Sequence, residues 1–543
     1  MYEELKARLT AAVDAVVCSE SVKKLVVAGP GSGKTHLFRL LLEKSEAGQD
    51  NALVLTFINN LKDDLARDLG TMSQVYTFHA YCRRLLHQSP RVRGRLTDAF
   101  HYFPPLPTLI KTDWEIMYGG KIPKFVGLMR DLQEGDETDF YTARADYYDA
   151  VSFDDSVFRA YKGLKKYPGE MDHYKLLLVD EYQDFNKLEV ELLDMMSATS
   201  SIVVAGDDDQ ALYSQLRNSD TAYIRGLYAE AAYTNFSLPF CMRCTAPVVG
   251  AVGDLIHRAR ALGRLPGRID KPYEFYPPKK ERDTNQYPNL KDVVTTVQNG
   301  RANYFGRYIE QELAKIPEEE IREAEEGHFP TVLVIGPQQY LRQIREHLES
   351  VGYPCMASNS DESIELRRED GLRILKASED ANLGWRILLE LDKPAFFLDA
   401  VQRSAEEDHS MVSVLDQDYQ AKILAEVRAF TEDDDVDNEA PVEEKAPRIN
   451  IKLVSYEGSK GLSAQHVFIV GLHNGDLPRV ATAPTDLEIC KFLVALTRTR
   501  KQCHLLHTRR WGATTKEASV FLSWIDRSRI SQIFVNAKYW KQI

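Results

Sequence analysis

The chain is poor in cysteine, and it has neither a long hydrophobic run nor an excess of positive charge. Seven cysteines in 543 residues form no disulfide framework, which favours a reducing environment. No apolar run approaches the roughly 20 residues that a membrane-spanning helix needs. The amino-terminal stretch is charged and amphipathic and lacks the basic start and apolar block of a secretory signal. We therefore expect a cytoplasmic protein with no membrane partner.

Closely spaced cysteines occur once, as Cys241 and Cys244 in "CMRC". A structural zinc site needs four ligands, commonly from two such pairs. No second Cys or His pair at zinc-finger spacing accompanies this one, so the sequence does not favour zinc.

The net charge is −13, which taken alone argues against tight binding to nucleic acid. Much of this charge lies in residues 431–447, "TEDDDVDNEAPVEEKAP", where eight acidic residues accompany one lysine. Such a run is typical of a solvated linker. The rest of the sequence is closer to balance, so the composition is compatible with a basic groove.

Short apolar runs rich in β-branched residues recur along the chain, and a helical pattern follows each. This alternation predicts parallel sheets that are covered by helices on both faces. We expect one sheet before about residue 255 and a second after about residue 330, with insertions at 84–170 and 366–447. The runs are "KLVVAG", "ALVLTF", "KLLLVDE", "SIVVAGD", "TVLVIG", "IKLVSY" and "HVFIVG".

The stretch "VVAGPGSGKTHLFRLLLE" reads as a strand, a glycine-rich loop and a helix. Gly29, Gly31 and Gly33 allow the backbone to turn its amides onto phosphate oxygens, helped by the helix N-terminus. Lys34 would reach the β- and γ-phosphates, and the Thr35 hydroxyl would hold Mg²⁺. A simple glycine turn is the alternative, but the strand and helix on either side favour a phosphate loop.

A second chemical motif is "LLLVDEYQDFN", a buried strand that ends in carboxylates. Unpaired buried charges are costly, so the carboxylates need a cation. Asp180 is placed to bind the Mg²⁺ of Thr35 through water, and Glu181 is placed to activate the attacking water. This pair favours nucleotide hydrolysis over transfer to a metabolite. An acidic cap for the helix that starts near "DFNKLE" is the alternative.

Further blocks follow in order: "LTFINNLKDDLARDL", "VYTFHAYC", "DEYQD", "VVAGDDDQALY", "FSLPFCMRC", "SYEGSKGLSAQHVFIVGL" and "LVALTRTRK". Together with the phosphate loop, they resemble the ordered motifs of superfamily 1 DNA helicases of the UvrD/Rep type. The resemblance implies an α/β fold with two RecA-like P-loop domains, each carrying a mainly helical insertion. It also implies that ATP and Mg²⁺ bind between the domains. The expected units are 1–83 and 171–255 for the first domain, 84–170 for its insertion, 256–365 and 448–543 for the second domain, and 366–447 for the second insertion.

The resemblance also implies which residues carry each role. The catalytic set is Lys34, Asp180, Glu181, Gln210, Arg243 and Arg498. The nucleotide-binding set is Ala28, Gly29, Pro30, Gly31, Ser32, Gly33, Lys34, Thr35, His36 and Gln183. The DNA-binding set is Phe57, Asn59, Thr77, His79, Tyr213, Ser459 and Lys460. The metal ligands are Thr35 and Asp180.

Simpler alternatives stay open for several of these residues. Arg243 and Arg498 would neutralise charge on the transferred phosphate, or they form surface ion pairs. His79 lines the DNA strand, or it is a satisfied core histidine. Lys460 grips a phosphate, or it starts a helix after the turn that Gly461 supplies.

The chain departs from the family pattern where the base is bound. A glutamine normally reads the adenine edge, but here Val13 stands at that position in "LTAAV". Met242 stands where an aromatic residue normally stacks on the base. Losing both partners predicts loose specificity among ATP, GTP and CTP.

Other departures concern DNA binding and coupling. Gln215 or Leu216 stands where the family has a second large aromatic, which predicts a loss of about 1–3 kcal/mol in strand affinity. Glu457 replaces a usual histidine, and Ser463 replaces an acid that often contacts the nucleotide. Both changes predict slower turnover or weaker coupling.

The resemblance implies an ATP-dependent translocase or helicase that moves 3′→5′ on single-stranded DNA or a tailed duplex. Because the second insertion is short, translocation is a safer expectation than processive unwinding. The alternative is a DNA-responsive regulatory ATPase that controls a partner nuclease, as in anti-phage defence systems of the Gabija type. A small-molecule kinase with a phosphate loop is opposed by the Asp-Glu pair and by the helicase blocks.

Overall fold

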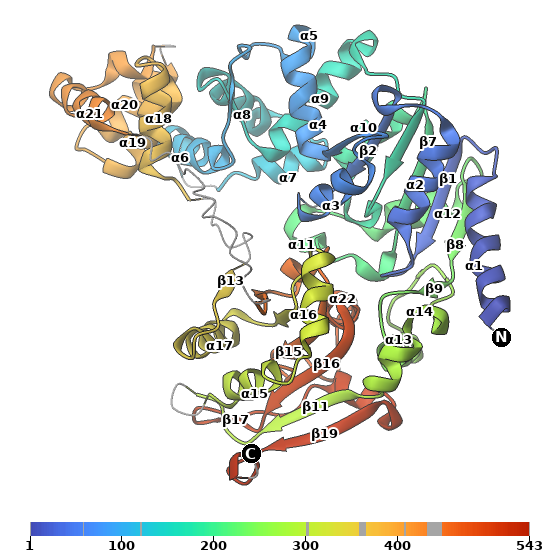
Figure 1. Cartoon of the computed structure of the whole chain (residues 1–543). Coiled ribbons are helices and arrows are strands. Elements are labelled where there is room, and N and C mark those ends of the chain that lie inside the picture. The colour runs from blue at the N-terminus through green and yellow to red at the C-terminus, as the bar shows by residue number, and fades with distance from the viewer. Residues whose placement is uncertain are drawn as a thin grey trace, which may run out of the picture.

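The computed structural model describes residues 2–57, 59–119, 122–299, 303–357, 365–406, 409–431 and 448–541. Two α/β domains lie one above the other, and a helical lobe flanks the upper domain (Figure 1). All but the first residue of the predicted acidic linker lies outside the described residues. None of the described helices is long and apolar enough to cross a membrane.

The first domain is built on a parallel sheet that has six strands within the described residues, in the order β3-β2-β6-β7-β1-β8. Successive residues of a strand point to opposite faces. Leu25 and Val27 of β1 therefore enter one hydrophobic core, while Val26 and Ala28 enter the core on the other face. The strands are β1 (Lys23–Ala28), β2 (Ala52–Thr56), β3 (Gln74–Thr77), β6 (Leu176–Val179), β7 (Ser201–Gly206) and β8 (Thr234–Leu238).

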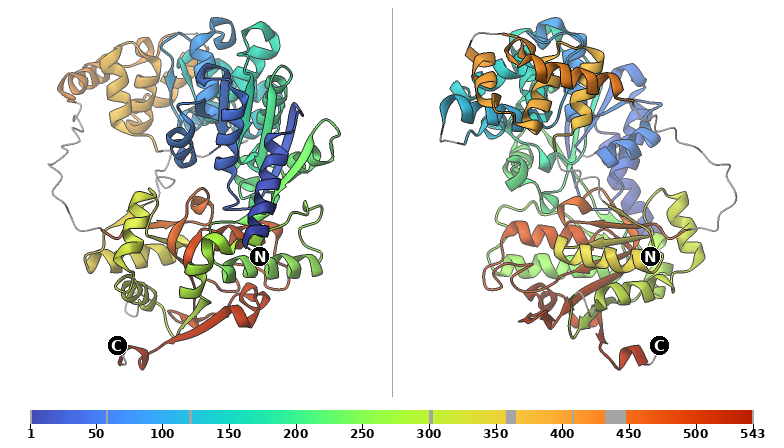
Figure 2. Two further views of the ribbon diagram at one scale, coloured as in Figure 1. Left: turned by 45° about the vertical axis from the view of Figure 1, so that its right-hand side comes forward. Right: turned by 90° about the vertical axis from the view of Figure 1, so that its left-hand side faces the viewer.

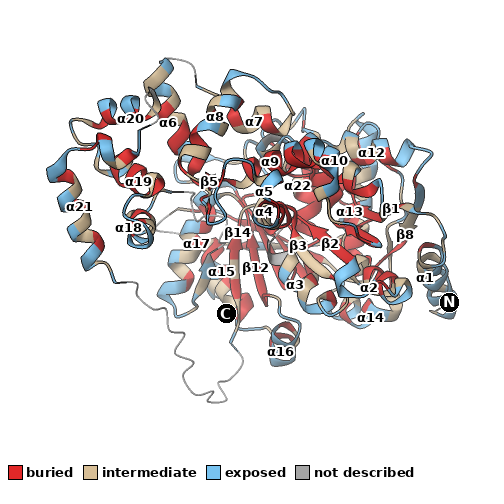
Figure 3. Cartoon of the chain, turned by 90° about the horizontal axis from the view of Figure 1, so that it is seen from above, coloured by how far each residue is buried: buried red, intermediate tan, exposed pale blue. Residues whose placement is uncertain are grey.

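Helices cover both faces of this sheet, and the strands between them are largely buried (Figure 3). Two-sided burial explains why these strands read as continuous apolar runs rather than as alternating ones. The helices are α1 (Tyr2–Val17), α2 (Lys34–Ser45), α3 (Asn59–Leu69), α10 (Lys187–Ser197), α11 (Ser214–Arg217) and α12 (Thr221–Ala229).

The second domain has a parallel sheet with seven described strands, in the order β13-β14-β12-β15-β16-β11-β19. The predicted fold with two parallel sheets is confirmed. The predicted start of this sheet after about residue 330 was wrong, since β11 already belongs to it. Lys291 and Asp292 interrupt the apolar run of that strand and hide it in the sequence. The strands are β11 (Leu290–Thr295), β12 (Val332–Ile335), β13 (Cys355–Ala357), β14 (Ile451–Val454), β15 (Ala464–Val470), β16 (Thr499–Thr508) and β19 (Ile530–Val535).

The chain passes to the second domain soon after β8. The next long helix, α13, packs its apolar face into the core of the second sheet, and the expected boundary at residue 255 falls inside it. The helices of this domain are α13 (Ala246–Ala261), α14 (Pro277–Gln286), α15 (Tyr304–Leu313), α16 (Glu318–Glu326), α17 (Gln338–Ser350) and α22 (Asp486–Leu496). Two-stranded pairs join β9 (Phe240–Cys241) to β10 (Glu274–Phe275) and β17 (Arg510–Trp511) to β18 (Thr514–Thr515).

Both insertions are mainly helical. The first contains α4 (Phe78–Gln88), α5 (Pro90–Arg93), α6 (Leu106–Tyr118), α7 (Phe125–Arg130), α8 (Asp136–Tyr147) and α9 (Phe153–Lys166), with the short strands β4 (His101–Tyr102) and β5 (Ala150–Val151). The second contains α18 (Arg368–Ala377), α19 (Asn382–Asp392), α20 (Phe397–Glu406) and α21 (Gln417–Ala429). Although it interrupts the second domain in sequence, this second group packs α19 and α20 against α6 of the first (Figures 1 and 2).

A buried ionic network fastens the two insertions together. Asp113 of α6 accepts hydrogen bonds from Arg386 Nε and Arg144 Nε, each at 2.9 Å, and from the Tyr148 hydroxyl at 2.6 Å. Burial opposes ionisation of Asp113, but the two guanidinium groups outweigh it and lower its pKa. Arg144 also donates to the Ser404 carbonyl at 3.3 Å. The second insertion is thus held on the first domain by charges that would be costly to unpair.

Candidate nucleotide and DNA site

The phosphate loop lies between the end of β1 and the start of α2. Gly31 and Gly33 have φ angles of +70° and +93°, which side chains with a Cβ rarely adopt. Ser32 closes the loop by donating from Oγ to the Gly29 carbonyl at 2.8 Å. Lys34 then begins α2, as the glycine pattern predicts.

The predicted carboxylate pair faces that lysine. Lys34 Nζ lies 3.1 Å from Glu181 Oε1 and 3.7 Å from Asp180 Oδ1. Burial raises the pKa of Asp180. Burial also acts to raise the pKa of Glu181, but Lys34 and Lys460 outweigh it and hold that pKa well below its usual range. Glu181 therefore stays ionised. Its backbone has a φ of +55°, in the left-handed region that is strained for a residue with a Cβ.

The oxygens available beside the loop suit a hard cation. Thr35 offers a hydroxyl at the start of α2, and Asp180 offers a buried carboxylate at the end of β6. Oxygen donors of this kind are the ones that Mg²⁺ prefers. The alternative role as a helix cap does not apply, because Asn186 caps α10 through a hydrogen bond from Glu189 N at 3.1 Å.

Four hydrogen bonds connect this carboxylate to the second domain. Gln183 Nε2 donates to Glu181 Oε2 at 2.6 Å, and Asp207 N donates to Gln183 Oε1 at 2.9 Å. Gln210 Nε2 donates to Asp207 Oδ2 at 2.9 Å. Arg498 Nη2, from the second domain, donates to Gln210 Oε1 at 3.1 Å. Together with the contact from Lys34 to Glu181, these bonds bring four sequence-predicted blocks into one continuous chain of contacts.

Arginines without a carboxylate partner gather at this interface. Arg498 is 3% exposed, and burial together with nearby Arg243 lowers its pKa to about 10. Neither residue forms an ion pair within the described part of the chain, so the surface ion-pair alternative does not apply. Arg500, which the sequence reading missed, stacks on Phe329 at 3.7 Å, and burial and Arg243 lower its pKa to about 10. Unpaired guanidinium groups this close together suit a polyanion.

The aromatic residues predicted to line DNA also gather. The Phe57 ring lies 6.2 Å from His79 and 5.9 Å from Tyr213. Arg217, which the sequence reading missed, lies 3.7 Å over the Phe57 ring and donates to His79 Nε2 at 3.3 Å. Arg217 directly follows Gln215 and Leu216, one of which stands where the family has a second large aromatic, and Leu216 is 61% exposed.

A cavity of about 590 Å³ opens between these residues and the first insertion. Its walls combine flat rings with guanidinium groups, the pattern of sites that hold unpaired bases and their phosphates. Arg83 stacks 3.7 Å over Tyr102 in this wall. The lining residues are Phe57, Thr77, His79, Arg83, Tyr102, Pro104, Pro107, Val126, Arg130, Ser152, Phe153, Asp154 and Arg217.

Other residues of the predicted DNA set are engaged within the protein. Thr77 caps α4 by accepting from Ala80 N at 3.3 Å. Ser459 is buried and donates to the Tyr456 carbonyl at 2.6 Å. The Asn59 side chain lies outside the described residues.

Lys460 does not start a helix. Its ammonium, with the residue only 3% exposed, is hydrogen-bonded to Asp184 and lies 2.6 Å from the Gln210 carbonyl. Lys460 therefore bridges the second domain to the first beside the nucleotide site, at some depth from the surface.

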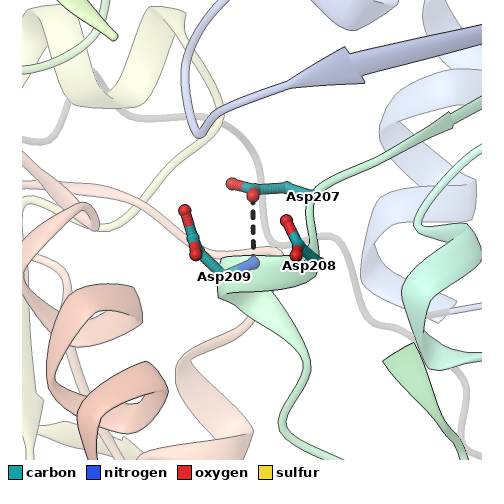
Figure 4. A group of neighbouring side chains, drawn as sticks. All are labelled: Asp207, Asp208 and Asp209. Atoms are coloured by element: carbon teal, nitrogen blue, oxygen red, sulfur yellow. Dashed lines mark hydrogen bonds between the residues drawn. The ribbon is translucent and has the colours of Figure 1, made fainter. Parts of the chain in front are cut away.

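Residues 207–209 form a compact group of three buried carboxylates (Figure 4). Lys271 Nζ lies 2.7, 3.0 and 2.8 Å from these three residues in turn. Arg225 adds an ion pair at 3.0 Å and Arg268 another at 2.8 Å. The protein itself therefore neutralises the cluster. Within the described residues, no other group of three His, Cys, Asp or Glu side chains is close enough to hold a metal.

Of the two residues expected near the base, Met242 lies against the phosphate loop. The Met242 methyl lies 2.7 Å from the position a Cβ would take on Gly33. His36 is exposed on α2, and Val13 of α1 packs against the hydrophobic core of the first domain. Val13 therefore offers an apolar side chain with no hydrogen bond for a base edge.

Comparison with known proteins agrees with this geometry. A family model described as an AAA domain matches residues 10–215. The ATP-dependent DNA helicase PcrA of Staphylococcus aureus (strain Mu50) is 23% identical over 414 residues, which cover 64% of this chain and 54% of that protein. PcrA of Staphylococcus epidermidis (strain ATCC 12228) is 24% identical over 397 residues, which cover 63% and 53%.

The chain is similar to UvrD/Rep-type helicases. The predicted resemblance is thereby confirmed. The matched part spans about half the length of these curated helicases. For this helicase-like chain, the AAA match encloses the phosphate loop, the Asp-Glu pair and the triple carboxylate.

Proposed function

We propose that the chain is an ATP-driven motor of the UvrD/Rep type that moves 3′→5′ along single-stranded DNA. The continuous contacts from Lys34 through Glu181, Gln183 and Gln210 to Arg498 carry this proposal. They join the two domains at the place where a triphosphate would bind. Hydrolysis of the triphosphate would break these contacts between the domains. The two domains would then move relative to each other.

In the proposed reaction, Lys34 and the loop amides hold the triphosphate. Glu181 takes a proton from the attacking water, because its carboxylate stays ionised beside Lys34 and can therefore accept one. Arg243 and Arg498 neutralise charge on the transferred phosphoryl group. Mg²⁺ held by Thr35 and Asp180 would neutralise the β- and γ-phosphates.

For DNA, the aromatic group of Phe57, His79 and Tyr213 and the cavity beside it support a track for unpaired bases. Stacking on aromatic rings accepts any base, so binding is expected to be insensitive to sequence. The partner is single-stranded DNA or a duplex with a single-stranded tail.

A DNA-responsive regulatory ATPase, acting with a nuclease, is the second candidate. The lack of a second large aromatic at Gln215 or Leu216 favours it, because weaker stacking on the bases would weaken the hold on DNA that movement needs. The docking of the second insertion on the first also favours a fixed assembly over a mobile one.

Two measurements on the purified chain test these proposals. We expect single-stranded DNA to stimulate ATP hydrolysis and the chain to displace a strand from a 3′-tailed duplex but not from a 5′-tailed one. Stimulation without displacement from either duplex supports the regulatory ATPase. Hydrolysis that ignores added oligonucleotide rejects both candidates.

A further inference from the structure

Two thiols in the loop between the domains have no part in the proposed reaction. Cys241 ends β9, and Cys244 precedes α13. The backbone N–H of Cys244 donates to Cys241 Sγ at 3.4 Å. The two cysteines are therefore in contact through the Cys241 sulfur, in the Cys-X-X-Cys spacing that reactive dithiols use.

The residues between the cysteines contact the phosphate loop. Met242 N donates to the Gly31 carbonyl at 2.9 Å. A Cβ on Gly31 would come within 2.4 Å of the Arg243 Cβ, and one on Gly33 would come within 2.7 Å of the Met242 methyl. The conformation of the "CMRC" loop therefore determines how closely Arg243 approaches the phosphate site.

The same loop contacts the second domain. Cys244 Sγ lies 3.6 Å from the Thr497 carbonyl oxygen, and Arg243 Nη1 donates to that oxygen at 3.4 Å. Thr497 directly precedes Arg498. A change at Cys244 would thus alter the positions of both Arg243 and Arg498.

The two thiols differ in acidity. Burial acts to raise the pKa of Cys241, but hydrogen bonds from the Cys244 thiol, the Tyr273 hydroxyl and two backbone N–H groups outweigh it and lower that pKa. The hydrogen bond to Cys241, followed by burial, raises the pKa of Cys244. One sulfur is favoured as a thiolate and the other as a thiol, which is the asymmetry that disulfide formation uses.

We propose that Cys241 and Cys244 form a reversible disulfide when the protein meets a hydroperoxide, and that this disulfide stops nucleotide hydrolysis. The effect on hydrolysis rests on the proposed function, whereas disulfide formation does not.

The chemistry balances with hydrogen peroxide as the oxidant. The Cys241 thiolate attacks one peroxide oxygen, the O–O bond breaks, and hydroxide leaves, giving a sulfenic acid. The Cys244 sulfur then attacks the Cys241 sulfur, the S–O bond breaks, and water leaves with the thiol proton. Two electrons pass from the thiols to the peroxide, and an added dithiol returns them.

The new bond would change the loop at the catalytic arginine. Once bonded to Cys241, the Cys244 sulfur can no longer donate to the Thr497 carbonyl. The disulfide would fix the backbone on both sides of Arg243, and the position of Arg243 depends on that backbone. Misplacing one arginine costs orders of magnitude in phosphoryl transfer.

Peptide mapping tests for the bond directly. The full chain is treated with hydrogen peroxide, free thiols are blocked with iodoacetamide, and the protein is digested with trypsin. Cleavage after Arg243 separates the cysteines, so the disulfide appears as peptide 226–243 joined to peptide 244–258. We expect this joined species after peroxide and its loss after dithiothreitol. If the species is absent, the proposal is overturned.

Hydrolysis in the oxidised and reduced states tests the consequence. We expect peroxide to slow wild-type hydrolysis by at least about tenfold, with recovery in dithiothreitol. For Cys241→Ser and for Cys244→Ser, the hydrolysis rate after peroxide should be close to the rate in dithiothreitol. Cys18→Ser, which removes an exposed cysteine elsewhere, should be inhibited like the wild type.

A joined peptide that leaves wild-type hydrolysis unchanged overturns the inhibitory role. Inhibition that persists in both serine variants overturns it as well. If the reduced wild type hydrolyses no nucleotide, the proposed function fails, and the peptide map still decides whether the pair forms.

Discussion

Arg498 and Gln210 are hydrogen-bonded at 3.1 Å, although Arg498 follows α22 of the second domain and Gln210 follows β7 of the first. An arginine of one domain thus ends within the proposed nucleotide site of the other. The contact is buried, so water does not compete for this hydrogen bond. Relative movement of the domains must break it, which links the chemistry to the shape of the molecule.

The first prediction concerns that arginine. Arg498→Ala should lower kcat for ATP hydrolysis by about 10³-fold or more, because an arginine on the transferred phosphoryl group acts chiefly in the transition state. KM should change far less. Steady-state kinetics measure both constants. Arg509 is an exposed arginine directly after β16, and Arg509→Ala is the matched control. An equal loss of kcat in both variants would contradict the assignment of Arg498.

Glu181→Gln should keep nucleotide binding and slow hydrolysis by at least about 10²-fold, because the shape stays while the base is lost. Binding of a fluorescent ATP analogue and single-turnover hydrolysis measure the two effects. Lys34→Ala should lose both, since it removes the cation that faces the phosphates. Normal hydrolysis by Glu181→Gln would show that another group is the base.

Nucleotide choice should be loose. With Val13 and Met242 at the base, we expect hydrolysis rates for ATP, GTP and CTP within about tenfold of one another. Met242→Tyr should sharpen the preference by restoring a stacking partner. Rates measured across the four nucleotides decide this, and a strong preference of the wild type for ATP would refute it.

The acid sensitivity of the first domain should depend on His79. Burial, followed by nearby Arg217, lowers its pKa to about 3, against about 6.5 in an unfolded chain. Below pH 6.5 the unfolded state gains a proton that the folded state does not, so stability falls as pH falls. Between pH 6.5 and 5 this costs about 2 kcal/mol. His79→Gln should remove that loss, as measured by thermal denaturation at both pH values. An unchanged pH dependence would be inconsistent with a neutral, buried His79.

Breaking the network between the insertions should destabilise the helical lobe. Asp113 is fully buried, and Asp113→Ala leaves Arg144 without a carboxylate partner and Arg386 with Glu390 alone, at a cost of about 3–5 kcal/mol. Limited proteolysis should then cut within α18 to α21 sooner than in the wild type. Asp399→Ala breaks only an exposed pair with Arg403, and we expect a change within about 0.5 kcal/mol. Equal sensitivity of both variants would argue against the network.

The parts of the site that were predictable are local in sequence. Gly31, Gly33 and Lys34 lie within one turn of chain, and Asp180 and Glu181 are neighbours, so spacing alone identifies their chemistry. The two-sided burial of the strands likewise leaves a continuous apolar signal. β11 was not predicted, because its charged residues Lys291 and Asp292 break the apolar pattern. Their partners, Glu312 and His507, come near only in the folded protein.

Arg217 and Arg500 were missed for a related reason. A single arginine carries no periodic signal, and its meaning depends on which rings and charges surround it. Lys460 shows the same limit, because its residue type suggested a phosphate contact while folding buried it beside Asp184.

The sequence by itself determined the phosphate loop, the carboxylate pair and the two parallel sheets, because short-range geometry and burial patterns are written in adjacent residues. Only the tertiary structure decided that Arg386 would meet Asp113 across 273 positions, that Lys271 would neutralise residues 207–209, and that "CMRC" would lie against both domains. Pairings between distant charges leave no trace in local sequence, since their energy exists only once the chain has brought them out of water together.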